Sequence, residues 1–319
     1  MRAGAVACAR VTRVRRAAAV LLLGGALAPI GCARGVPAGS PLIVPSGADA
    51  GAAARNVAAR ARHAEIIYLG EQHDNPAHHA AQRQILEALV AAGARPVVAF
   101  EMLERGEQTG LGRALAEARA PDELARRLRW RERGWPDFSM YWPLFDLAAT
   151  VGLPVVAADL ERVQARRIAR GGLAALGDDA AELRSLLAPD AAREAALARE
   201  IAEAHCGALP AERLAPMVEA WHARNVVMAR RLVQALDRSG QVVVIIGRGH
   251  QQAGGLPAQV AALRPGTRQL VVDLVEAPAG VDPGRRASDS RGDVVWLTPP
   301  AERPDPCAAL RPAPSRLSD

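Results

Sequence analysis

Lysine is absent from this sequence, and all 40 of its basic residues are arginine. The absence excludes Schiff-base chemistry on lysine and a Walker-type phosphate loop, because both depend on a lysine amine. Aromatic residues are scarce as well: five tryptophans, two tyrosines and three phenylalanines are spread over 319 residues. Any local cluster of aromatic side chains in this chain is therefore informative.

Acidic residues are missing from the first 31 residues, which carry five arginines. The formal net charge of the chain is +6, and subtracting those five leaves +1 for the rest. A nearly neutral body lacks the broad positive field that binding to phosphates requires, so we expect no nucleic-acid partner. Half of the residues are hydrophobic and 23% are charged, which is typical of a globular protein and excludes a mainly disordered chain.

The amino terminus has the pattern of an export signal. A basic head precedes a 14-residue apolar run, Ala17–Ile30, which is too short to span a bilayer comfortably. Gly31 and Cys32 follow this run, and a glycine before a cysteine resembles the end of a bacterial lipobox. We therefore predict an export signal at 1–31, lipidation of Cys32 and a flexible tether at 32–58. The predicted location is a membrane-anchored lipoprotein facing the periplasm or the cell surface; plain secretion and an uncleaved anchor are the alternatives.

Cysteine is also rare, with four residues in the chain. Cys8 lies in the predicted signal and Cys32 is the predicted lipid anchor. Cys206 and Cys307 remain in the exported body, where an oxidising compartment permits a disulfide between them. Such a bridge is a hypothesis that the sequence cannot test.

Short apolar runs alternate with longer helical patterns along the body. This alternation predicts an α/β fold with a mainly parallel sheet that is flanked by helices on both faces. We expect a single domain at 59–298, with helical cap insertions at about 104–150 and 160–238, and a loose tail at 299–319. The predicted strands are Glu65–Leu69, Pro96–Phe100, Leu153–Ala157, Val242–Ile246, Gln269–Val275 and a short edge strand at Val294–Leu297.

Polar residues follow several of these strands directly. Glu71 and His73 follow the first strand, Glu101 the second, and His250 the fourth. The carboxyl ends of parallel strands meet at one edge of a sheet, so we expect these four side chains to share one pocket. Carboxylate and imidazole together suit acid–base catalysis or a divalent metal ion, although no tight metal-ligand spacing is present. Taken singly, each residue also fits a helix cap, a solvated loop or a core position.

Six of the ten aromatic residues fall between positions 130 and 145. Such a cluster either anchors a helical layer to the sheet or forms a wall for a flat apolar ligand, to which Tyr141 would offer an oxygen. The other tyrosine, Tyr68, lies inside a predicted strand and is expected in the core. A predicted helix at 217–231 carries His222 and Asn225, and its polar face either lines the pocket or packs on the sheet.

Several motifs in order along the chain resemble those of the ChaN-like haem-binding lipoproteins. They are GEQHDNPAHHAAQRQ at 70–84, FEM at 100–102, WPDFSMYWPLFDLA at 135–148, LPVVAADL at 153–160, AHCGALP at 204–210, MVEAWHARNVVMA at 217–229 and VVVIIGRGHQQAGGLP at 242–257. The chain departs from the family pattern at Trp221 and Asn225, where glutamine and aspartate are usual. The family is similar in fold to the Tiki and erythromycin-esterase group, whose members hydrolyse substrates with Glu and His at the equivalent strand ends.

The resemblance implies an exported lipoprotein that binds haem, with a role in iron acquisition and a homodimer as one possible assembly. It implies Tyr141 as the iron ligand, with His73 and His250 as alternative metal ligands. Arg248, whose planar fork suits a carboxylate, is predicted to pair with a propionate. His222 and Trp142 complete the predicted cofactor contacts. The alternative is a hydrolase in which Glu71, His73, Glu101 and His250 are catalytic, with or without a divalent metal.

Overall fold

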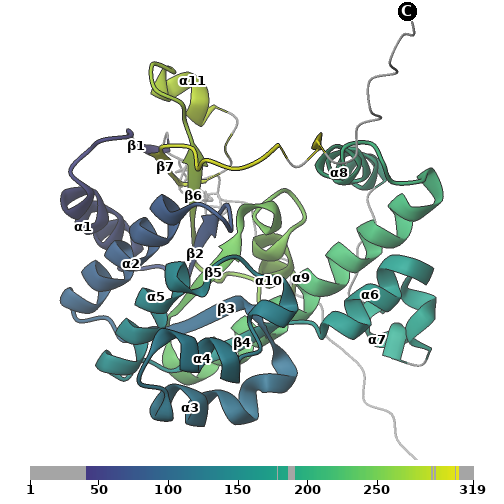
Figure 1. Ribbon diagram of the computed structural model, residues 1–319, viewed down its shortest axis with the longest axis horizontal. Coiled ribbons are helices and arrows are strands. Elements are labelled where there is room, and N and C mark those ends of the chain that lie inside the picture. The colour runs from purple at the N-terminus through teal and green to yellow at the C-terminus, as the bar shows by residue number, and fades with distance from the viewer. Residues whose placement is uncertain are drawn as a thin grey trace, which may run out of the picture. The chain divides into compact units, whose positions relative to one another are not determined.

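Figure 1 shows the computed structural model, which describes residues 41–177, 179–185, 191–288, 290, 292–305 and 307–308. The predicted export signal at 1–31, the lipidation site Cys32 and the last part of the predicted tail, from 309 onward, lie outside the described residues. Over the described ranges, none of the helices combines the length and the apolar character that crossing a membrane requires.

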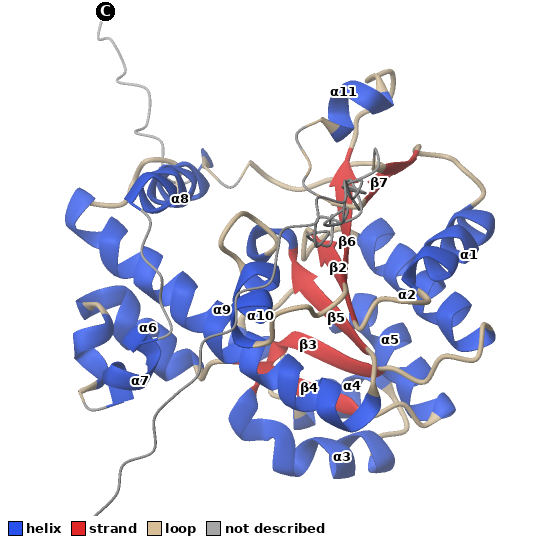
Figure 2. Cartoon of the chain, turned by 180° about the vertical axis from the view of Figure 1, so that it is seen from behind, coloured by secondary structure: helices blue, strands red, loops and turns tan. Residues whose placement is uncertain are grey.

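The core of the fold is a seven-stranded sheet in which every pair of neighbouring strands is parallel. Its order is β1-β7-β6-β2-β5-β3-β4, and Figure 2 shows the strands in red between the helical layers. The α/β class and the parallel sheet predicted from the sequence are confirmed. The strands are β1 (Leu42–Val44), β2 (Ile66–Glu71), β3 (Val97–Glu104), β4 (Val155–Asp159), β5 (Val242–Gly247), β6 (Gln269–Glu276) and β7 (Val294–Thr298).

Both faces of the sheet are covered, which explains why its strands are apolar at nearly every position. Ile67 and Leu69 of β2 point into one core, while Ile66 and Tyr68 point into the other. Helices on the first face are α1 (Ala50–Ala61), α2 (Pro76–Ala91) and α5 (Phe138–Val151), with α3 (Gln108–Glu117) and α4 (Pro121–Arg127) packed beside α5. The second face is covered by α9 (Ala211–Ser239) and α10 (Leu256–Leu263).

Helices α6 (Arg162–Gly171) and α8 (Ala191–Ala204) pack on α9 rather than on the sheet, and α7 (Asp179–Ser185) joins the apolar cluster between α6 and α9. The sequence predicted helical caps over the sheet at 104–150 and 160–238. The structure differs, because α5 and the second half of α9 are ordinary covering layers that bury apolar faces against the strands. Phe145 of α5, for example, stacks on Phe100 of β3 with ring centroids 4.2 Å apart.

The described part of the predicted tether is structured. Residues 42–44 form β1, which pairs with β7, and α1 begins at Ala50 behind an Asp49 side chain that accepts hydrogen bonds from Gly51 N and Ala52 N. The sequence predicted neither this strand nor this helix, because short alanine-rich runs show no clear hydrophobic periodicity. The edge strand of the sheet on this side is therefore β1, and β7 lies one position inside it.

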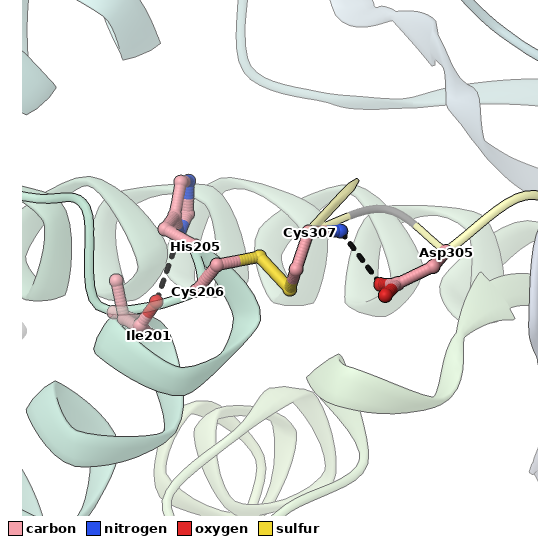
Figure 3. The surroundings of a disulfide bond; sticks show 5 residues. All are labelled: Ile201, His205, Cys206, Asp305 and Cys307. Carbon is pink, nitrogen blue, oxygen red and sulfur yellow. Dashed lines mark hydrogen bonds between the residues drawn. A yellow bond between two sulfur atoms is a disulfide. The ribbon is translucent and has the colours of Figure 1, made fainter. Parts of the chain in front are cut away.

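A disulfide joins Cys206 to Cys307, with the two Cα atoms 5.6 Å apart (Figure 3). This confirms the bridge that the sequence left as a hypothesis. Between β7 and the bridge, Arg303 pairs with Asp74 and Glu276 at the carboxyl ends of β2 and β6. The segment after β7 is therefore attached both to the strand edge and to the loop between α8 and α9.

Candidate functional site

Four neighbouring strands, β2, β5, β3 and β4, bring polar groups to one edge of the sheet. Glu71 ends β2, Gly247 ends β5, Glu101 lies in the last half of β3, and Asp159 ends β4. Glu71 and Glu101 are each 1% exposed. Two carboxylates this deeply buried need compensating partners, and the structure supplies a different set to each.

Glu71 is held by four side chains. Its Oε1 accepts hydrogen bonds from Tyr141 Oη at 2.5 Å and from His73 Nδ1 at 2.8 Å. Its Oε2 accepts one from Gln82 Nε2 at 2.6 Å, and His79 Nδ1 lies 3.4 Å away. Burial alone would raise the pKa of Glu71, but the His73 hydrogen bond and the neighbouring imidazoles outweigh it and lower that pKa. Glu71 therefore stays ionised with no oxygen free to act as a base on water.

His73 is oriented by this carboxylate. Its Nδ1 faces Glu71, whereas its Nε2 has no hydrogen-bond partner among the described residues. The side chain is 33% exposed, and its ring meets the Trp135 ring edge-on at 5.1 Å. Burial would lower the pKa of His73, but the hydrogen bond to Glu71 and the charges of Glu101 and Glu71 raise it. His73 is thus held in a fixed position by Glu71, with its Nε2 beside Gly247 and without a hydrogen-bond partner among the described residues.

Glu101 is compensated by charge. Arg224 Nη2 donates to Glu101 Oε1 at 2.7 Å and to Asp159 Oδ2 at 2.6 Å, so one guanidinium bridges two carboxylates. The other oxygen, Glu101 Oε2, accepts from the backbone N–H of Gly247 at 2.6 Å. Burial would raise the pKa of Glu101, but the charges of His250 and Arg224 hold it well below its usual range.

Both ring nitrogens of His250 have a partner within the protein. Its Nε2 lies 3.3 Å from Glu101 Oε1, and its Nδ1 lies 3.0 Å from Asn225 Oδ1. The Asn225 amide orientation is set by its Nδ2, which donates to the carbonyl of Trp221. The Trp221 ring is stacked on the His250 ring at 6.0 Å. Both ring nitrogens of His250 are therefore occupied by protein partners.

The two glycine-containing segments, 70–73 and 247–251, pack against each other across the β2–β5 pair. A Cβ at Gly247 would lie 2.8 Å from the His73 ring, and a Cβ at Gly70 would lie 2.2 Å from Gln251. Each glycine therefore leaves room for a side chain from the other motif. The pairing of Glu71 with Gly247 in the sheet register brings the motifs level with one another.

A cavity of about 460 Å³ opens beside this edge, between the ends of β3 and β4 and the helices α6, α8 and α9. Trp135 and Trp221 line it, so it adjoins both imidazoles through their ring partners. Its remaining walls are mostly apolar, and several arginines are placed around them. The apolar lining residues are Met102, Leu160, Ala165, Ala169, Ile201, Met217 and Ala220.

The structure brings Glu71, His73, Glu101 and His250 together, but it places Tyr141 elsewhere than expected. Tyr141 is 0% exposed, and its hydroxyl is engaged by Glu71. Burial and the adjacent carboxylate also raise the pKa of this hydroxyl. The sequence predicts that Tyr141 offers its oxygen to iron, whereas in this structure the side chain supports Glu71 from within the core.

The other predicted cofactor contacts lie off the cavity. Arg248 makes a two-point ion pair with Asp273, with Nε and Nη2 at 3.0 and 2.9 Å from its oxygens, so its fork is already occupied. His222 is 9% exposed, does not line the cavity, and has its pKa lowered by burial. Trp142 packs near Phe138 of the same helix and does not line the cavity. In addition, the described residues contain no group of three or more His, Cys, Asp or Glu side chains arranged to hold a metal ion.

Sequence reasoning missed the supporting residues Gln82, His79 and Arg224, and the arginines of α6. Gln82 and His79 lie in the GEQH…HHAAQ run, where their spacing on α2 turns them toward the end of β2. The signal for α6 was its composition, since residues 162–171 carry four arginines and no acid.

Comparisons with known proteins agree with this fold. The structure is similar to ChaN of Campylobacter jejuni, reported with cofacial haem binding, at a TM-score of 0.57 and 22% identity over 72% of this chain and 87% of that chain. Weaker likenesses are the type III effector HopBA1, at a TM-score of 0.45 and 13% identity over 81% of this chain and 97% of that one, and a mutant erythromycin esterase EreC, at 0.39 and 13% over 67% and 71%.

A search of curated proteins found no match. A family model described as haem-binding uptake, Tiki superfamily, ChaN matches residues 57–260, which include the whole strand-edge site. The family resemblance predicted from the sequence motifs is thereby confirmed. The chain belongs to the ChaN family of the Tiki superfamily of haem-binding uptake proteins.

Proposed function

We propose that this protein is an exported lipoprotein that binds haem in the cavity beside the strand edge and serves iron acquisition. The observation that carries the proposal is the family match over residues 57–260 together with an apolar cavity flanked by Trp135 and Trp221. Haem binding by the ChaN protein of C. jejuni supports the same conclusion.

The residues around the cavity fit a haem group. A volume of about 460 Å³ is within the usual range of ligand pockets, and flat indole rings with aliphatic walls suit a porphyrin face. Both tyrosines of the chain are fully buried, so neither supplies the phenolate ligand that the resemblance implied. Haem iron, when bound, would supply visible absorption and a redox couple.

We assign the iron ligand to His73. It has the one open ring nitrogen of the two strand-edge pairs, and its ring touches Trp135 of the cavity wall. A carboxylate on the other nitrogen fixes the tautomer and the ring orientation, as second-shell carboxylates do for metal-bound histidines. His250 cannot replace it, because Asn225 and Glu101 occupy both of its nitrogens.

Haem titration of the chain carrying Cys32→Ser tests the proposal. We expect a shifted, saturable Soret band with the wild-type site and a change of ligand-sensitive bands, with at least about tenfold weaker binding, for His73→Ala. The matched control is His63→Ala, because His63 is exposed and precedes the amino end of β2, opposite the strand ends. The absence of saturable binding would overturn the proposed function, and an unchanged spectrum for His73→Ala would overturn the assignment of the ligand.

Export and anchoring rest on the basic, apolar and Gly31-Cys32 order at the amino terminus. The Cys206–Cys307 bridge supports export, because disulfides persist in oxidising compartments. Cys32→Ser should release the protein from the membrane fraction, and a variant that stays bound and unprocessed would contradict lipidation.

A deletion strain should grow on inorganic iron but poorly on haem as the iron source, and equal growth on both would contradict a role in iron acquisition.

We further infer that two copies pair when haem is bound, because haem binding is cofacial in the C. jejuni relative. Light scattering of the Cys32→Ser chain with and without haem measures this directly. A monomeric mass at saturating haem would contradict it.

Hydrolysis is the second candidate function. The observation that favours it is the Glu71–His73 pair, in which an oriented imidazole has a free Nε2 able to take a proton from water. Neither glutamate fits the role of general base, because the oxygens of both are already hydrogen-bonded. Turnover of chromogenic esters that is lost in His73→Gln would support this function, and the absence of turnover would leave haem binding alone.

A further inference from the structure

Four arginines line the cavity, and they differ in what they contact. Arg133 is paired with Glu107 and lies 3.4 Å from Glu104. Arg224 bridges Glu101 and Asp159, as described above. The charges of these two arginines are therefore neutralised by protein carboxylates. The other two are Arg162 and Arg166.

Arg162 and Arg166 have no carboxylate partner among the described residues. Arg162 Nη1 donates to the backbone carbonyl of Glu132 at 2.9 Å, which leaves the charge of its guanidinium uncompensated. Arg166 is exposed and makes no hydrogen bond within the described ranges. Glu161, the residue before Arg162, pairs with Arg105 instead, so the acid nearest in sequence is already engaged.

The two residues are four positions apart on α6 and so project from the same face of the helix. Ala165 and Ala169 lie between and beside them on the cavity lining, and these short side chains leave the space in front of the guanidinium groups open. The helix itself contains no acidic residue that could fold back on them. The cavity therefore has an apolar interior and two neighbouring free positive charges on its α6 side.

We propose that Arg162 and Arg166 bind the carboxylate groups of the cavity's ligand, so that the site selects a flat apolar molecule with carboxylates along one edge. Guanidinium groups bind carboxylates through paired, charge-assisted hydrogen bonds, and haem carries two propionates on one edge. The inference rests on the proposed function, and it replaces the earlier assignment of Arg248, which is already paired with Asp273. It also predicts that a porphyrin without free carboxylates is a poor ligand.

The test compares haem with its dimethyl ester, in which both propionates are neutral, in the wild-type site and in an Arg162→Gln/Arg166→Gln double variant. The wild-type protein should prefer haem over the diester by about 10–100-fold, since charge-assisted pairs in a partly buried site have this order of effect. The double variant should lose that preference by binding haem more weakly, while its affinity for the diester changes less than about threefold.

The matched control is Arg167→Gln/Arg170→Gln, which removes the same charge from the same helix outside the cavity lining. It should keep the wild-type preference, which separates a local contact from the general field of the helix. Equal binding of haem and diester by the wild-type protein, or an equal loss for both double variants, would overturn the inference while leaving haem binding intact. Failure of the wild-type protein to bind haem would instead overturn the proposed function and this inference with it.

Discussion

The two imidazole–carboxylate pairs at the strand edge are built from the same residue types and differ in accessibility. The His73 side chain is 33% exposed with Nε2 open, whereas that of His250 is 7% exposed with both nitrogens engaged. Their glutamates differ as well, because Glu71 accepts from the neutral donors Tyr141 and Gln82, and Glu101 is paired with Arg224. The partner of the second ring nitrogen, rather than the carboxylate, therefore decides whether an imidazole can bind a ligand or move a proton here. We call Glu71–His73 the open pair and Glu101–His250 the closed pair.

Replacing Arg224 with Met should have the largest effect, because it removes the cation of the closed pair. Glu101 and Asp159 would then lie buried without the charge between them, and breaking a buried ion pair lowers the free energy of unfolding by about 3–5 kcal/mol. Denaturant unfolding measures this loss. The control is Arg127→Met, which removes an exposed ion pair that contributes little to stability, and similar losses for both variants would contradict the comparison.

Gly247→Ala should disturb the open pair specifically. The new Cβ would lie 2.8 Å from the His73 ring and 3.3 Å from Glu101 Oε2, so the imidazole must move away from Glu71. We expect a loss of about 1–3 kcal/mol in unfolding free energy, together with altered haem bands. Gly249→Ala is the matched control in the same motif, since a Cβ there would have nothing within 4 Å. Unaltered haem bands in Gly247→Ala would show that His73 does not depend on this space.

Tyr141→Phe should weaken the support of Glu71 while leaving the bands of bound haem unchanged. It removes one donor from a buried carboxylate, which should reduce the free energy of unfolding by about 1–2 kcal/mol. Tyr68→Phe is a suitable control, because the Tyr68 hydroxyl donates to the neutral amide of Gln269 on the other face of the sheet. A lost charge-transfer band in Tyr141→Phe would restore tyrosine as the ligand and undo the distinction between the two histidines.

The smallest expected effect is a pH dependence carried by the open pair. The pKa of His73 is raised above 6.5 by Glu71 and Glu101. Its contribution to stability is therefore fully present below pH 6.5 and is lost as the pH rises through the folded-state pKa. Haem affinity should change in the opposite direction over the same range, because the deprotonated Nε2 is the form that binds iron. Unfolding and binding curves across pH 5–9 measure both, and His73→Asn should flatten them; a profile unchanged by that substitution would assign the titration to another group.

Much of this arrangement could be predicted because it depends on sequence-local rules. Apolar runs at 65–69, 96–100 and 242–246 indicated buried parallel strands, and the carboxyl ends of such strands meet at one edge. This rule of strand ends predicted that Glu71, His73, Glu101 and His250 lie together. Short elements such as β1 were not predicted, because three residues in an alanine- and proline-rich stretch carry no periodicity.

By itself, the sequence determined the parallel sheet, the family and the strand-end residues, because hydrophobic runs and ordered motifs act over short distances along the chain. Only the tertiary structure decided which imidazole stays open, since Tyr141 reaches Glu71 from 70 residues away and the Gly247 N–H reaches Glu101 from 146 residues away. It likewise paired Arg248 with Asp273 and, within the described part of the chain, left Arg162 and Arg166 without carboxylate partners. Burial, and the choice of partner for each polar atom, are set by packing between distant segments, which no local pattern records.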